Sequence, residues 1–212
     1  MNRALLAVPF IVAALLAAIW GGLSRSGWEL PMPAAAGAHG HLMVNCFLAS
    51  LIMLERAVTM RQWWLRLLPL LNALAVIPFL AGYATPAQWM LLAGSSGFLL
   101  LCCWFVYRYR DLYYYVFVAA AAALLAGNII LLRTGSYPAA AGWWMVFLLF
   151  TIVAERLELS KFLPRTWLQK GLLLVFLALS LLALLITPPV GDYLLAFALA
   201  GSAAWLLRFD MA

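Results

Sequence analysis

Charged residues are scarce in this chain: of 212 residues only 9% are charged, whereas 68% are hydrophobic. A water-soluble domain has about 25% charged residues. At this length a soluble fold could not bury so much apolar surface, because a large share of a small domain lies at its surface. The composition therefore excludes a water-soluble protein. The net charge of +6 does not indicate a nucleic-acid partner, because Lys and Arg also accumulate in the cytoplasmic loops of membrane proteins.

Cysteines and catalytic motifs are few or absent as well. The chain has three cysteines, two of them adjacent (Cys102 and Cys103), which is too few for a disulfide framework. No phosphate-binding loop, nucleophile elbow or zinc-protease motif is present, so the enzyme types that carry them are set aside. Whether the protein is an enzyme stays open, and the sequence favours a protein that is not one.

Long apolar runs are what the sequence has instead. A helix needs about 20 apolar residues to cross a hydrocarbon core of about 30 Å, and only helices or closed barrels satisfy their backbone groups there. We predict an all-α, polytopic transmembrane helical bundle of about eight spans. The predicted spans are residues 4–23, 40–60, 64–83, 87–107, 112–132, 139–158, 168–187 and 192–208. The first is interpreted as a retained helix, because it is longer than the apolar part of a signal peptide.

The positions of the basic residues predict the orientation of these spans. With a cytoplasmic N-terminus and eight spans, only Arg25 and Arg133 lie on the outer side. The other eleven basic residues lie on the cytoplasmic side, as the positive-inside rule requires. They are Arg3, Arg56, Arg61, Arg66, Arg108, Arg110, Arg156, Lys161, Arg165, Lys170 and Arg208. We therefore expect both termini to be cytoplasmic.

Two segments about 100 residues apart resemble each other. Residues 41–60 contain the pair Glu55–Arg56, and residues 141–160 contain the pair Glu155–Arg156. This predicts a single transmembrane domain with possible repeat halves, residues 1–110 and 111–212. Each pair has two interpretations: an ion pair that fixes the depth of its helix, or charged groups that relay ions or protons along a path.

The only two histidines of the chain stand together in AHGHLMVNCF, residues 38–47. His39, His41, Met43 and Cys46 supply imidazole and soft sulfur donors, which suit haem iron or copper. On a regular helix His39 and His41 point about 200° apart, so convergence on one metal requires an irregular entrance to the helix. The alternative is that the histidines bond loop carbonyls while Met43 and Cys46 pack.

The stretch WELPMPAAAGAHGHLMVNCFLASLI resembles the NnrS family, in which a His-x-His-x-Met motif opens the second span. The resemblance covers residues 1–60 and implies a bacterial inner-membrane protein with haem b, copper or both, acting in nitric-oxide or redox-stress physiology. It assigns His39, His41 and Met43 to the cofactor site, and Cys46 is a further candidate metal ligand.

Two other functions are compatible with the sequence. One is a small two-repeat transporter or channel that uses Glu55, Arg56, Glu155 and Arg156. The other is a packing subunit of a larger membrane complex. The expected partners are therefore the lipid bilayer and, beyond it, other membrane subunits or further copies of the chain, with no nucleic acid.

Overall fold

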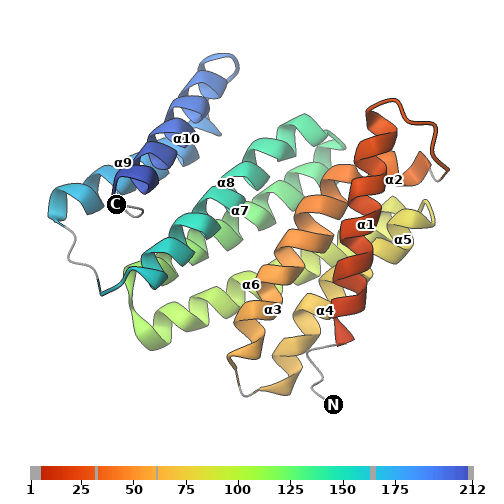
Figure 1. Ribbon diagram of the computed structural model, residues 1–212, viewed down its shortest axis with the longest axis horizontal. Helices are drawn as coiled ribbons and strands as arrows, with labels where there is room; N and C mark the ends of the chain where they lie inside the picture. The colour runs from red at the N-terminus through yellow and green to blue at the C-terminus, as the bar shows by residue number, and fades with distance from the viewer. Residues whose placement is uncertain (1–5, 32, 61, 163–165, 210–212) are drawn as a thin grey trace. The chain divides into compact units, whose positions relative to one another are not determined.

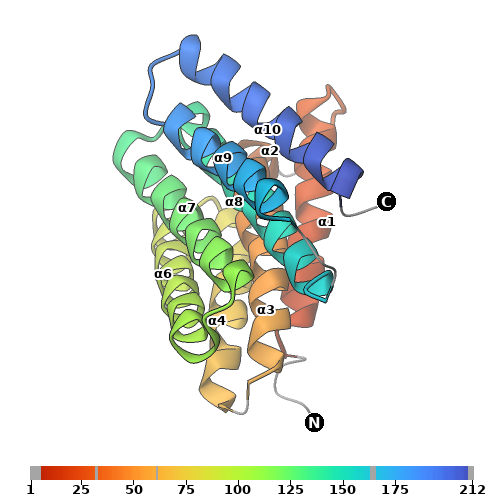
Figure 2. The same ribbon diagram turned by 90° about the vertical axis from the view of Figure 1, so that its left-hand side faces the viewer.

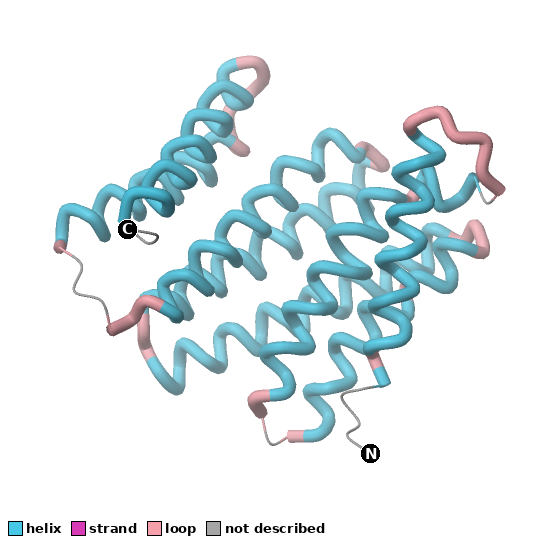
Figure 3. Tube along the Cα trace, in the orientation of Figure 1, coloured by secondary structure: helices cyan, strands magenta, loops and turns pink. Residues whose placement is uncertain are grey.

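The computed structural model describes residues 6–31, 33–60, 62–162 and 166–209, and these form helices joined by short turns, with no strand among them (Figure 3). The order along the chain begins with α1 (Val8–Arg25), the short α2 (Pro33–Gly37), the π-helical segment η2 (His41–Ala49) and α3 (Ser50–Val58). It continues with η3 (Trp63–Arg66), α4 (Leu67–Leu74), α5 (Val76–Leu80) and α6 (Ala84–Tyr109). The last elements are α7 (Leu112–Thr134), α8 (Tyr137–Leu159), α9 (Trp167–Ala183) and α10 (Val190–Phe209) (Figure 1).

Six of the helical segments are long and apolar enough to cross a membrane. They are Val8–Arg25, His41–Val58, Ala84–Tyr109, Leu112–Thr134, Tyr137–Leu159 and Val190–Phe209. The prediction of an all-α fold is confirmed, and six helices have the length and apolar composition that the predicted spans require. The count of eight spans is not confirmed, because the two remaining apolar segments, Leu67–Leu80 and Trp167–Ala183, are shorter than the about 20 residues that a full crossing needs.

Proline and glycine determine several helix boundaries. Pro78 has no N–H to donate to the carbonyl of Leu74, four residues earlier, and the helix is interrupted at that place, between α4 and α5. Gly82 ends α5 with a φ of 83°, and Gly135 follows α7 with a φ of 66°. These backbone conformations are open to glycine at little cost, so both turns follow directly from the sequence.

The contacts within the chain group it into two compact units. Unit 1 is the chain up to Leu101 together with Asn128–Ala141. Its helix α1 packs on α2 and η2 through small residues, among them the fully buried Ala14 and Ala18. At Gly21 a Cβ atom would lie 2.3 Å from the carbonyl oxygen of Ala35, so only glycine permits this approach. Small residues at helix contacts are typical of membrane proteins.

Unit 2 comprises Cys102–Gly127 and Gly142–Ala212, and α9 and α10 form a hairpin within it (Figures 1 and 2). A capping box begins α9: the N–H of Gln169 donates to Thr166 Oγ1, and the N–H of Thr166 donates to Gln169 Oε1. The indole N–H of Trp205 donates to the carbonyl of Gln169 over 2.8 Å. At Gly201 a Cβ atom would lie 2.3 Å from the ring of Phe176.

Replacing Gly201 by Leu is expected to separate α9 from α10. The side chain would overlap the Phe176 ring, and overpacking of this kind costs about 1–3 kcal/mol. Gly171→Leu on α9 is the matched control, since a Cβ atom there meets nothing within 4 Å. Thermal unfolding in detergent should show a lower Tm for Gly201→Leu and no loss for Gly171→Leu. Equal values for both variants would contradict this packing.

Candidate functional site

The histidine stretch lies on an unusual piece of backbone. His41–Ala49 is π-helical over nine residues, whereas most π-helices are single turns inside α-helices, often at functional sites. In this segment each hydrogen bond joins residues five apart, so the carbonyl positions differ from those of an α-helix. The carbonyl of Asn45 accepts side-chain hydrogen bonds, from Asn72 Nδ2 at 2.6 Å and from Ser50 Oγ at 3.4 Å.

Asn72, in α4, connects the π-helical segment to neighbouring helices. Its Nδ2 also donates to Ser50 Oγ over 3.0 Å, and its side chain is 1% exposed. A Cβ atom at Gly94 of α6 would lie 2.4 Å from Asn72 Oδ1, so the amide lies directly against the backbone of α6. Polar side chains buried in a membrane protein commonly join helices in this way.

His41 continues the same polar group toward the start of η2. The ring is 1% exposed, stacks on Phe79 with centroids 4.7 Å apart and meets the edge of Tyr137 at 5.5 Å. Asn45 Nδ2 lies 3.4 Å from His41 Nδ1. We call His41, Asn45, Ser50 and Asn72 the polar track; each of the four is buried and all belong to unit 1.

A hollow of about 220 Å³ lies beside the His41 end of the polar track. Phe79 and Tyr137 line the hollow and also contact the His41 ring, so one layer of aromatic side chains separates that ring from the hollow. The other lining residues are Gly37, Ala38, Gly82 and Ala84. Sites for drug-sized ligands occupy about 300–1,000 Å³, so this space suits a smaller molecule.

His39 faces a different helix. Its Nδ1 donates to the carbonyl of Ala18 in α1 over 2.8 Å, and a Cβ atom at Gly22 would lie 3.1 Å from the ring. The two imidazoles therefore contact different helices: His39 contacts α1, and His41 contacts α5 and α8. Cys46 is fully buried in an apolar cluster that Met43 packs against.

The candidate donors have different surroundings. Among the residues that the structure describes, no group of three or more His, Cys, Asp or Glu side chains could hold one metal ion. His39 contacts α1, His41 contacts α5 and α8, and Cys46 belongs to an apolar cluster. The cofactor site at His39, His41, Met43 and Cys46 stays a prediction.

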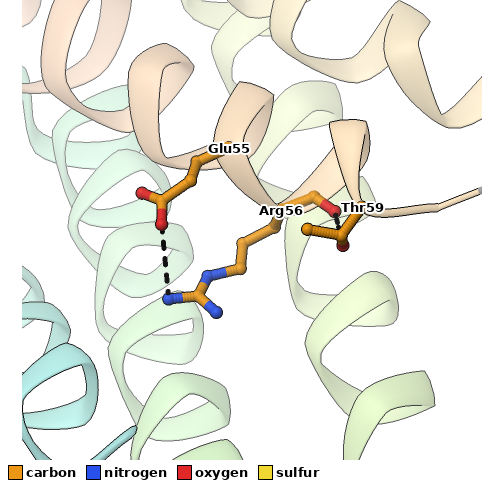
Figure 4. A network of polar contacts seen from close by, with 3 residues as sticks. All are labelled: Glu55, Arg56 and Thr59. Carbon is orange, nitrogen blue, oxygen red and sulfur yellow. Dashed lines mark hydrogen bonds and ion pairs between the residues drawn. The ribbon is translucent and has the colours of Figure 1, made fainter. Parts of the chain in front are cut away.

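The two Glu–Arg pairs differ in their surroundings. Arg56 Nη2 lies 3.9 Å from the carboxylate of Glu55 (Figure 4). The Arg56 side chain is 10% exposed and that of Glu55 is 60% exposed. In α8 the burial is reversed: Arg156 is exposed and Glu155 is partly buried. Adjacent helical residues point about 100° apart, so the contact between Glu55 and Arg56 is a long one, and it is of the ion-pair kind that is one of the two interpretations of the sequence. Because the Glu55 side chain is largely exposed, an ion pair of this length stabilises a protein by at most about 1 kcal/mol.

Sequence reasoning missed Asn72, Phe79 and Tyr137. Asn72 alone could have been found from the sequence, because it is a single amide within the apolar run LLPLLNALAVIPFL, residues 67–80. A polar residue inside a membrane segment is a candidate functional residue by default. Nothing in the sequence could have placed the two aromatic rings against His41, because they come from α5 and α8.

Comparison with known proteins assigns the family. A model described as a domain of unknown function, DUF8744, matches residues 3–212. The chain belongs to the DUF8744 family. No curated protein and no solved structure matches it. The NnrS resemblance is therefore wrong: the DUF8744 match covers nearly the whole chain, whereas the resemblance rested on a short histidine motif near the N-terminus.

Removing the amide of Asn72 is expected to destabilise this DUF8744 protein. Asn72→Leu keeps the number and branching of the side-chain heavy atoms but leaves the Asn45 carbonyl without its 2.6 Å donor, at a cost of about 1 kcal/mol. Ser96→Ala is the control, because the Ser96 hydroxyl donates only within its own helix, to Leu92. Thermal unfolding and hydrogen exchange of residues 41–50 measure the effect. Unchanged exchange in Asn72→Leu would show that the amide does not hold the π-helical segment.

Proposed function

We propose that this chain is a small membrane transport protein in which the polar track forms part of the route of a small polar solute. The observation that carries the proposal is the position of His41. It is a buried ionisable group in a membrane-spanning segment, one aromatic layer behind a hollow, and followed by Asn45, Ser50 and Asn72. Groups of this kind at membrane depth are costly, and they commonly mark solute or ion pathways.

The hydrogen bonds of the polar track support a role beyond joining helices. A network that served only to join helices would satisfy all of its buried polar atoms. Asn45 Oδ1 is buried and accepts no hydrogen bond from the residues that the structure describes. It is an acceptor that a solute could use, next to the imidazole of His41.

The interrupted backbone around the polar track supports transport as well. Irregular or broken helices are tolerated at membrane depth where they are buried in protein or line a cavity, and they form the solute sites of many transporters. Here a π-helical segment packs against the interrupted pair α4 and α5. Met53 lies on α3 between Ser50 and Arg56 and is fully buried. A solute that continues from the polar track toward Arg56 therefore needs the Met53 side chain to move.

The short segments Leu67–Leu80 and Trp167–Ala183 favour this function further. They start 100 residues apart, which is the spacing of the predicted repeat. Short or interrupted apolar segments in corresponding positions of two halves indicate a transporter binding site. We propose that both also cross the membrane, which gives eight spans, with both termini on the cytoplasmic side of a bacterial inner membrane. The hollow beside His41 then opens on the periplasmic side.

The size of the hollow restricts the solute. A volume of about 220 Å³ corresponds to about seven molecules of water, each of which occupies about 30 Å³ in the liquid. The proposed solute therefore has few non-hydrogen atoms, and it carries at least one group that can hydrogen-bond with His41 or Asn45. Formate, urea and glycerol are suitable probes of this size.

Replacing His41 by Phe is expected to abolish most of the flux. Phenylalanine can still stack on Phe79 but offers no polar atom, and a loss of about 1.4 kcal/mol of interaction lowers flux roughly tenfold. His39→Phe is the matched control, because it alters the other histidine of the chain, which contacts α1. Uptake of the three probes into proteoliposomes is followed by stopped-flow light scattering, and proton entry by a trapped pH dye.

The outcomes of this experiment separate the alternatives. Flux of a probe in the wild type and in His39→Phe, but not in His41→Phe, supports the proposal. Proton entry without solute flux would replace the solute route by a proton relay through His41. If the wild type conducts neither, the transport function is wrong. If the wild type conducts a probe and both variants conduct it equally well, the route past His41 is wrong.

Metal content distinguishes transport from the haem and copper prediction. Because the donors do not converge on one position, we expect the purified protein to show no Soret band and less than one copper per chain. Absorbance spectra of the oxidised and dithionite-reduced protein and elemental analysis test this. A Soret band or stoichiometric copper that disappears in His41→Ala would overturn the transport proposal in favour of a cofactor site.

A further inference from the structure

Lysine is the rarer cation in this chain. Of the 13 basic residues, only two are lysines, Lys161 and Lys170. Both line the same hollow of about 250 Å³ in unit 2. The hollow lies where α8 ends and where α7 and α9 begin, so it is independent of the polar track and of the function proposed for it.

The hollow contains both charges and hydroxyl groups. Besides the two ammonium groups it is lined by Asp111, Tyr113 and Ser160, with Leu112 and Leu157 as its apolar members. Its formal charge is +1, from two lysines and one carboxylate. The Tyr113 hydroxyl donates to Asp111 Oδ2 over 3.2 Å, and the Ser160 hydroxyl donates to the carbonyl of Arg156.

Exposed apolar side chains stand close in the sequence to the two lysines of this hollow. Phe162 is 88% exposed, Trp167 is 89% exposed and Leu168 is 86% exposed. Lys161 Nζ lies 5.0 Å from the ring centre of Phe162, and Lys170 Nζ lies 5.8 Å from that of Trp167. Trp and other amphipathic side chains concentrate at the membrane surface, and lysines there extend their charged ends toward the headgroups. Lysines beside exposed aromatic side chains are typical of the headgroup region of a bilayer.

We propose that this hollow binds the headgroup of an anionic phospholipid. A lysine is a compact point charge and a common phosphate binder, and basic pockets between membrane helices bind anionic headgroups. The exposed rings and Leu168 lie where the acyl chains of such a lipid would pack. Both lysines act on the phosphodiester, and Ser160 and Tyr113 face the remaining headgroup atoms.

Asp111 restricts the kind of headgroup. A carboxylate beside the phosphate repels a second negative charge, so it disfavours dianionic inorganic phosphate. It accepts hydrogen bonds from hydroxyl groups, and a headgroup with hydroxyls beside a singly charged phosphodiester meets both requirements. This is the chemistry of phosphatidylglycerol. Phosphatidylcholine lacks both the net charge and the hydroxyl donors.

The test compares lipid binding by intact variants. Native mass spectrometry of the full chain in detergent, titrated with phosphatidylglycerol or phosphatidylcholine, measures the affinity. The double variant Lys161→Gln/Lys170→Gln should bind phosphatidylglycerol roughly tenfold more weakly or worse, since each basic residue contributes substantially to anionic-lipid binding. Arg208→Gln is the matched control, because this cation also lies 5.7 Å from a ring, that of Phe209, but does not line the hollow.

Each outcome decides for or against the proposal. Preference for phosphatidylglycerol that is lost in the double variant and kept in Arg208→Gln supports it. Equal weakening in Arg208→Gln would show general surface electrostatics and overturn it. Displacement of the lipid by millimolar inorganic phosphate would show a site for free phosphate instead. Lysine acetylation gives a second readout in the unmutated chain: phosphatidylglycerol, but not phosphatidylcholine, should protect Lys161 and Lys170, and equal labelling with both lipids would contradict the site.

Discussion

The contact on which unit 1 depends is the hydrogen bond from the Asn72 side chain to the Asn45 carbonyl. In hydrocarbon every backbone polar group must find its partner within the protein. Because η2 is π-helical, its carbonyls lie at other positions than in an α-helix. The Asn72 side chain, from another helix, donates to one of these carbonyls, that of Asn45, over 2.6 Å. Ser50 bonds both the same carbonyl and the Asn72 amide. The irregular backbone of the site and the buried amide therefore stabilise each other.

The need to satisfy polar groups within the protein also requires the helices to pack closely. The Asn72 amide reaches its partners because Gly94 leaves room for its oxygen. On the other side of η2, α1 comes close through Gly21 and Gly22, which brings the Ala18 carbonyl within reach of His39. Van der Waals packing of small residues is a main source of helix association in lipid, where apolar burial gives no advantage. The small residues thus position His39 and the Asn72 amide.

The sequence was sufficient for the fold class and insufficient for the site. Apolar runs separated by charges, glycine and proline predicted the helices, because hydrocarbon thickness leaves few alternatives. The count of spans could not be settled in this way, since Pro78 interrupts one run and the run after Thr166 is short. The histidine stretch was singled out correctly as unusual, but its partners could not be found. Phe79 and Tyr137 contact His41 through tertiary packing, and no spacing rule relates residues on α5 and α8 to residue 41.

The spacing of 100 residues that suggested a repeat also shows where the two halves differ. His41 corresponds to Ala141, Asn45 to Met145, Ser50 to Phe150 and Asn72 to Leu172. Every member of the polar track thus has an apolar counterpart, and Phe150 is as buried as the serine that it replaces in the alignment. The Glu–Arg pairs recur, but with their burial reversed. If the chain arose from a repeat, the second half has lost or never had the polar groups. Two equivalent transport routes are therefore incompatible with these residues, and the route that we propose uses residues of unit 1 alone.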